Sequence, residues 1–197
     1  MRQYDGSVAE VHVLVDGYVG PSEDDQRVGS TVTFVRDGDV LVVVDPGLVV
    51  STASILDRLS ALDVSPTDIT DVVFSHHHPD HTLNAALFPE ARFHDHWAIY
   101  RRDVWMSRPA EGFVLSPGVS LLETPGHTPQ DITTLVETND GTVACTHLWW
   151  SAAGPAEDPY APDPAVLHTQ RARVLDRVNV IVPGHGAPFV PNAETPR

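Results

Sequence analysis

The residues best suited to chemistry lie within one short segment, residues 75–81, which holds four histidines and one aspartate. The segment follows the pattern His-x-His-x-Asp-His and comes directly after the apolar run 72–74. Neutral imidazole and anionic carboxylate together suit zinc and related metals. So many imidazoles would repel one another if protonated, so a metal is the simplest reason to gather them. His77 points away from its neighbours in an extended chain, which leaves as candidate ligands His76, His78, Asp80 and His81.

Two further histidines stand in turns of the same construction. His127 and His185 each follow a Pro-Gly pair, and each pair comes after a strand-like run, at 119–123 and 178–182. Proline fixes one backbone angle, and glycine lets the chain approach a ligand closely. A stiff turn at the end of a strand is how a rigid scaffold presents a ligand.

The order of apolar patterns predicts an α/β fold. Alternating or β-branched runs predict strands near 11–15, 31–35, 40–44, 72–74, 119–123, 132–138, 142–147 and 178–182. Residues 36–39 read as a hairpin turn. Helices are expected through Ile55, Leu59 and Leu62, with Ser51 or Thr52 as N-cap, around 82–87, and after Asp163-Pro164. Two mainly antiparallel sheets flanked by helices, an αββα four-layer sandwich, account for this order and place the strand-end loops along one edge.

Three segments look too irregular for the core and are expected to shape a pocket: 17–29, 104–118 and 149–162. Trp149 and Trp150 begin the last of them, and at least one of the two is expected to face the substrate; in the alternative, both pack inside. His94 and His96 flank an expected strand-to-helix junction, as pocket rim or structure. His12 and His168 have no motif context and are expected at the surface.

Composition narrows the classes of function. A chain of 197 residues is expected to form a single domain over 1–197. Acidic residues outnumber basic ones 27 to 12, a net charge of −15, which disfavours nucleic-acid binding because that binding relies on cations meeting phosphates. The basic run of Arg101, Arg102 and Arg108 reads as a solvated face.

The single cysteine, Cys145, suits a reducing compartment. It reads as a small core residue; a ligand role beside His147 is the less favoured alternative. Residues 1–5 lack the apolar stretch of a secretion signal, and no window approaches a membrane span. We therefore expect a cytoplasmic protein with no membrane partner.

From residue 28 to residue 190 the chain resembles the metallo-β-lactamase-fold hydrolases, the superfamily of glyoxalase II, lactonases and ribonuclease Z, and in particular its compact branch. The matching elements are the His-x-His-x-Asp-His loop, Thr-Pro-Gly-His-Thr around His127, and the late Gly-His at His185. The resemblance implies a first metal held by His76, His78 and His127, and a second held by Asp80, His81 and His185.

One position departs from the family. Most members carry an aspartate that bridges two metals where this chain has His147. A neutral imidazole ligates one metal and cancels no charge, so the second metal is expected to bind more weakly, or the pair to share a hydroxide alone. In the alternative, His147 turns away and hydrogen-bonds a loop carbonyl. Zinc is the default metal, one ion or two, with iron or manganese as alternatives.

The resemblance implies hydrolysis by a metal-bound hydroxide, with Asp80 steering the water or taking its proton. A small-molecule thioester, lactone or ester is the favoured substrate. A phosphodiesterase or ribonuclease is the second hypothesis, and the acidic balance argues against it. A β-lactamase would need export, and an iron dioxygenase of this fold would need the carboxylate that His147 replaces. A non-catalytic metal-binding role stays open, as does the oligomeric state.

Overall fold

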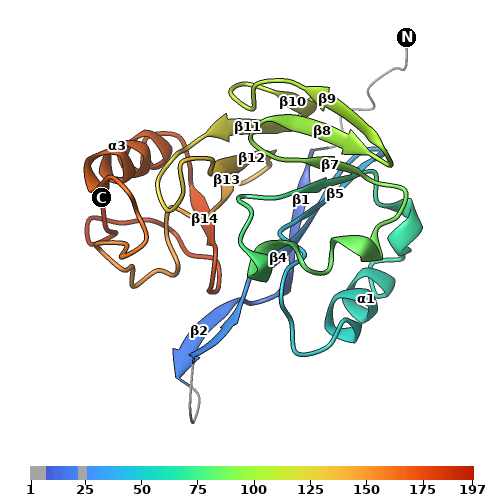
Figure 1. Cartoon of the computed structure of the whole chain (residues 1–197), viewed down its shortest axis with the longest axis horizontal. Coiled ribbons are helices and arrows are strands. Elements are labelled where there is room, and N and C mark those ends of the chain that lie inside the picture. The colour runs from blue at the N-terminus through green and yellow to red at the C-terminus, as the bar shows by residue number, and fades with distance from the viewer. Residues whose placement is uncertain (1–7, 22–25) are drawn as a thin grey trace.

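The first half of the chain builds a seven-stranded sheet in the order β1-β4-β5-β6-β7-β8-β9 (Figure 1). The computed structural model describes residues 8–21 and 26–197. Strand β6 pairs in parallel with β5 and β7, and the other neighbours in this sheet are antiparallel. The strands are β1 Glu10–Val15, β4 Val32–Asp37, β5 Val40–Val44, β6 Asp71–Val73, β7 Arg92–His94, β8 Ala98–Arg101 and β9 Val104–Ser107.

The second half builds a five-stranded sheet in the order β10-β11-β12-β13-β14. Only β13 and β14 pair in parallel in this sheet; its other neighbours are antiparallel. A separate hairpin of β2, Tyr18–Pro21, and β3, Gln26–Gly29, projects from the body (Figure 1). The strands of the second sheet are β10 Val114–Ser116, β11 Val119–Glu123, β12 Ile132–Thr138, β13 Gly141–Thr146 and β14 Val180–Pro183.

Alternation along the strands divides the apolar side chains into three clusters and so into four layers. In β5, Val42 and Val44 face the second sheet, whereas Val43 packs with Ile55 and Leu59 of helix α1, Ala53–Ser60. Side chains of β11, β13 and β14 on the far side of the second sheet pack under helix α3, Pro164–Leu175. The two helices lie on opposite sides of the paired sheets (Figure 1). The αββα sandwich predicted from the sequence is confirmed.

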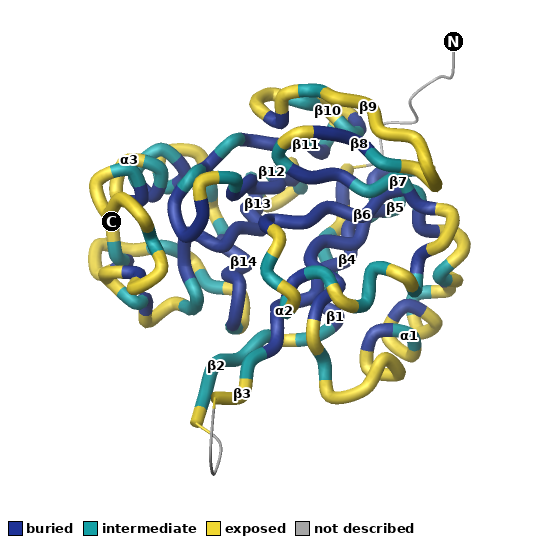
Figure 2. The backbone as a smooth tube through the Cα atoms, in the orientation of Figure 1, coloured by how far each residue is buried: buried dark blue, intermediate teal, exposed yellow. Residues whose placement is uncertain are grey.

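The ends of four strands deliver the histidine-bearing loops. The 75–81 loop follows β6 and leads into the short helix α2, Pro79–Thr82. His127 follows β11, His147 follows β13 directly, and His185 follows β14. The central strands of the two sheets are largely buried, whereas exposure rises in the peripheral loops, in α1 and in the edge strand β9 (Figure 2).

Several local predictions were wrong. The segments 17–29 and 104–118 are not irregular, because they contain the β2–β3 hairpin and strands β9 and β10. Strand β9 is exposed throughout and the other three strands are short and only partly buried, so none of the four shows a regular alternation between buried and exposed positions. Residues 1–7 and 22–25, and with them the segment searched for a secretion signal, lie outside the described residues.

Two helix predictions also need correction. The helix expected around 82–87 begins earlier, at Pro79, and ends at Thr82; a 3-10 turn, Ala85–Leu87, follows. Proline at the first helical position explains this start, since its missing N–H costs nothing there. The junction at 94–96 joins β7 to β8, both strands. Within the described residues, no helix has both the length and the apolar content needed to cross a membrane.

Candidate metal centre

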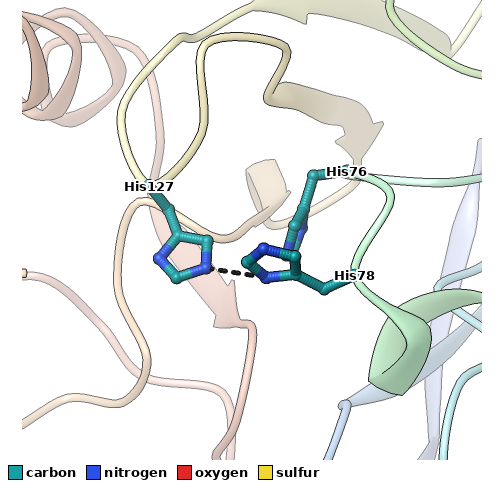
Figure 3. A group of neighbouring side chains, drawn as sticks. All are labelled: His76, His78 and His127. Atoms are coloured by element: carbon teal, nitrogen blue, oxygen red, sulfur yellow. Dashed lines mark hydrogen bonds between the residues drawn. The ribbon is translucent and has the colours of Figure 1, made fainter. Parts of the chain in front are cut away.

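The strand-end loops bring the predicted ligands into one cluster. Ligand atoms of His76, His78 and His127 lie within 4.8 Å of one another, and so do those of Asp80, His81 and His185. Figure 3 shows the first set: the His127 ring comes from one loop and the rings of His76 and His78 from another, and they converge. His127 Nε2 lies 3.1 Å from His78 Nδ1.

A glycine allows the 75–81 loop to pack this closely against the chain after β5. A Cβ atom on Gly47 would lie 1.6 Å from the carbonyl oxygen of Asp80, so only glycine fits there. The next residue, Leu48, donates its backbone N–H to that same oxygen at 2.9 Å. The turn after β5 therefore fixes the backbone that carries Asp80 and His81.

In four of the imidazoles, the Nδ1 atom makes a hydrogen bond to an oxygen of the surrounding protein. His81 Nδ1 donates to Asp45 Oδ2 at 2.9 Å, His127 Nδ1 to Asp158 Oδ2 at 2.7 Å, and His185 Nδ1 to the Gly29 carbonyl at 3.0 Å. Ser75 Oγ donates to Asp45 and lies 3.0 Å from His76 Nδ1, which donates to it. Each of these contacts puts the proton on Nδ1 and leaves the Nε2 lone pair facing the cluster.

His147 lies in the middle of the cluster. Its ring centroid is 4.1 Å from that of His127 and 4.6 Å from that of His76, and its Nε2 lies 3.0 Å from His185 Nε2. A Cβ on Gly184 would lie 2.3 Å from the His147 ring, so glycine before His185 makes room for this imidazole. The ring is directed at the other ligands, and among the described residues its Nδ1 has no hydrogen-bond partner.

The chemistry of these nitrogens fits a cation. Burial, followed by the neighbouring imidazoles, lowers the pKa of His76 and His147 well below its ordinary value, and burial lowers the pKa of His185 to about 4. The rings are therefore neutral and have lone pairs to offer. Within the described residues, His76 Nε2 and His81 Nε2 are buried without a hydrogen-bond partner. Buried polar atoms left unpaired are costly, and a divalent ion would satisfy them.

A cleft of about 460 Å³ opens beside His185. Tyr18 and Val19 of β2 line one side, and the segment from Trp150 to Pro155 lines the other. The two tryptophans at the start of segment 149–162 differ in their surroundings: Trp149 is fully buried, whereas Trp150 lines the cleft. Segment 149–162, as expected, is largely irregular and shapes this cleft.

The remaining histidines of interest lie outside the cluster. His77 Nε2 donates to Asp95 at 2.9 Å, and His94 is buried against Asp71 at 2.7 Å. Cys145 is buried between the sheets, where burial raises the pKa of its thiol to about 12, so it behaves as a core residue.

Sequence reasoning missed two carboxylates behind the ligands. Asp45 stands in the turn after β5 and Asp158 in the irregular segment 149–162, and no local pattern marks either residue as functional. Each lies more than 30 residues from the histidine it contacts. The one available signal was the Asp-Pro-Gly turn at 45–47, which marks a backbone with special requirements.

Comparison with known proteins places the chain in a family. The sequence profile of the metallo-beta-lactamase superfamily matches residues 25–188, and the chain belongs to this superfamily. It is 34% identical over 193 residues to metallo-beta-lactamase domain-containing protein 1 of Xenopus laevis, covering 93% of this chain and 82% of that protein. It is 33% identical to the Mus musculus protein of the same name, but spans only 60% of its length.

Solved structures agree with the fold. A Thermotoga maritima protein described as a candidate metallo-beta-lactamase is 25% identical and superimposes with a TM-score of 0.74, covering 94% of this chain and 100% of its own. A quorum-quenching N-acyl homoserine lactone lactonase has a TM-score of 0.64 at 17% identity, covering 90% of this chain and 91% of its own. At that identity the likeness speaks for the fold alone.

Proposed function

We propose that this protein is a metal-dependent hydrolase that cleaves an ester-like bond, a thioester, lactone or ester, in a small-molecule substrate. The observation that carries the proposal is the cluster of imidazoles with one carboxylate, Asp80, beside an open cleft. His76, His78 and His127 would hold one divalent ion, and Asp80, His81 and His185 a second, with His147 adding nitrogen to either. Zinc suits this nitrogen-rich set best.

A divalent ion bound here would supply a water of lowered pKa and a Lewis acid for the developing oxyanion. The chain's own contribution is to hold the ligands. Asp45 and Ser75 fix the rings of His81 and His76, and Asp158 that of His127. Asp80 Oδ2 lies 3.4 Å from His81 Nε2 and 3.6 Å from His185 Nε2, at the second ligand set, where it can orient a water or accept its proton.

The cleft favours a small substrate. Trp150 and Tyr18 give it apolar walls, and its volume suits a compact acyl group rather than a nucleic-acid strand. The net charge of −15 opposes the approach of a polyanion. A phosphodiesterase is therefore the less favoured reaction, although it belongs in any substrate screen.

The test begins with metal content of the purified protein, followed by reconstitution of chelated protein with zinc, manganese or iron. Each form is assayed on a thioester, a lactone, an ester and a phosphodiester. We expect hydrolysis of at least one carbonyl substrate, lost on chelation and reduced about 100-fold or more in Asp80→Asn, which keeps the size of the side chain. The matched control is Asp103→Asn, in the exposed turn before β9. Tight metal binding with no hydrolysis would favour a non-catalytic metal-binding role.

A further inference from the structure

Asp158 is a buried carboxylate that the proposed chemistry does not use directly. It lies in the segment between β13 and α3, and the residue as a whole is only 5% exposed. Its Oδ2 accepts a hydrogen bond of 2.7 Å from His127 Nδ1. A buried carboxylate is costly unless its oxygens are satisfied, so its contacts indicate what keeps it there.

The contacts hold Asp158 in one orientation. Besides His127, its Oδ2 accepts from Trp150 Nε1 at 2.9 Å, and its Oδ1 accepts from the backbone N–H of Tyr160 at 2.9 Å. The rings of Trp150 and Tyr160 stack with centroids 5.9 Å apart. Both carboxyl oxygens of Asp158 thus act as hydrogen-bond acceptors, and each contact comes from an N–H group.

This arrangement has two consequences for His127. Because both oxygens of Asp158 act as acceptors, His127 donates to Asp158 from Nδ1, and its Nε2 faces His78 and the rest of the cluster. The carboxylate also places negative charge behind a ligand set that otherwise contains six imidazoles and one carboxylate. A carboxylate behind a metal-bound histidine fixes its orientation and raises its basicity.

We propose that Asp158 is a positioning residue for His127: it fixes the tautomer and ring plane of that histidine and strengthens it as a metal ligand. Trp150 donates a hydrogen bond to Asp158 and also lines the cleft. A contact chain therefore runs from the wall of the cleft through Asp158 to His127. The inference rests on the proposed function only in treating the cluster as a metal site.

The experiment measures zinc affinity by competition with a chromogenic chelator, so it needs no substrate. Asp158→Asn keeps the shape of the side chain and removes the charge. We expect it to weaken the tighter zinc site roughly 10- to 100-fold. The matched control is Asp163→Asn, which removes the same charge five residues away, at the N-cap of α3, where asparagine caps as well as aspartate does. Zinc affinity of the control should equal that of the wild type.

A second set of measurements separates positioning from a general structural effect. In a His127→Ala background, Asp158→Asn should cause no further loss of zinc affinity, because its target is gone. In nitrogen-15 NMR spectra of the metal-free protein, the Nδ1–H signal of His127 should be present in the wild type and lost or shifted in Asp158→Asn alone. Unchanged zinc affinity in Asp158→Asn, or an equal loss in both backgrounds, would overturn the inference.

A folding control completes the design. Thermal unfolding of each metal-free variant shows whether Asp158→Asn still folds. If it does not, Trp150→Phe decides: it removes one anchor of Asp158, and a smaller loss of zinc affinity in the same direction is expected, whereas no loss refutes the inference. Failure of the proposed function would look different, as an inactive protein whose zinc affinity still depends on Asp158.

Discussion

At the scale of single residues, His147 stands where the resemblance drawn from the sequence predicts an aspartate that bridges two metals. Its ring lies among four other imidazoles, and Gly184 leaves the space that it occupies. Its role as a ligand stays a prediction, as do the roles of the other proposed ligands. A ring in this place adds a neutral donor where a carboxylate would add charge, so the site should hold a second cation less tightly than one with a carboxylate there.

We predict that His147→Asp strengthens binding of a second zinc ion about tenfold or more, because it adds a negative charge between two cations. His147→Ala should weaken it without unfolding the protein, since the ring makes no hydrogen bond to the scaffold among the described residues. Isothermal titration of zinc into the chelated proteins gives both stoichiometry and affinity. Equal values in wild type and both variants would mean that His147 is not a ligand.

At the scale of elements, the turn after β5 leaves the space in which the backbone of the 75–81 loop packs. We predict that Gly47→Ala destabilises the protein by about 3 kcal/mol or more, because the added Cβ meets backbone atoms of Asp80 that cannot move independently. Zinc affinity should fall with it. Gly20→Ala is the matched control: nothing lies within 4 Å of its Cβ, so the change should stay within about 0.5 kcal/mol.

Chemical denaturation of the metal-free proteins measures this difference, and chelator competition measures the zinc affinity. If Gly47→Ala and Gly20→Ala had the same stability, the close packing of the two loops would not be required for folding. If Gly47→Ala lost stability but kept full zinc affinity, the turn would support the sheet without positioning the ligands.

At the scale of the whole molecule, the buried histidines make the stability of the metal-free protein depend on pH. Burial lowers the pKa of His76 and His147 in the folded state, and that of His185 to about 4, against about 6.5 in the unfolded chain. The unfolded chain therefore takes up protons that the folded protein does not. The stabilising contribution is complete above about pH 6.5 and is lost as the pH falls toward about 4.

We therefore predict that the free energy of unfolding of the metal-free protein decreases steadily from about pH 7 to about pH 4.5. Asp131 acts in the opposite sense, because burial raises its pKa to about 6 and its contribution is lost as the pH rises through that value. One carboxyl group does not offset several histidines. Urea denaturation at a series of pH values tests this, and a constant or increasing stability toward pH 4.5 would contradict it.

Zinc at 100 times its Kd should add about 2.7 kcal/mol to the free energy of unfolding near neutral pH.

The sequence by itself determined the candidate ligands and the layer order. Histidine and aspartate can bind metal wherever they stand in a chain. The Pro-Gly pairs at 125–126 and 183–184 indicate the ends of β11 and β14 from local sequence, without reference to the strands with which these pair. Every residue of β5 is apolar, as expected for a strand that is covered on both faces. The number of domains was also expected from length alone and stays a prediction.

The carboxylates that contact the ligands, and the pairing of the outlying strands, could be known only from the tertiary structure. Asp158 contacts His127 from 31 residues away and Asp45 contacts His81 from 36, and no local pattern encodes either pair. Strands β2, β3 and β9 are short and lack a buried face, so their pairing depends on neighbouring strands rather than on a local apolar pattern. The direction of the His147 ring likewise follows from the space that Gly184 leaves, because a side chain turns where its surroundings permit.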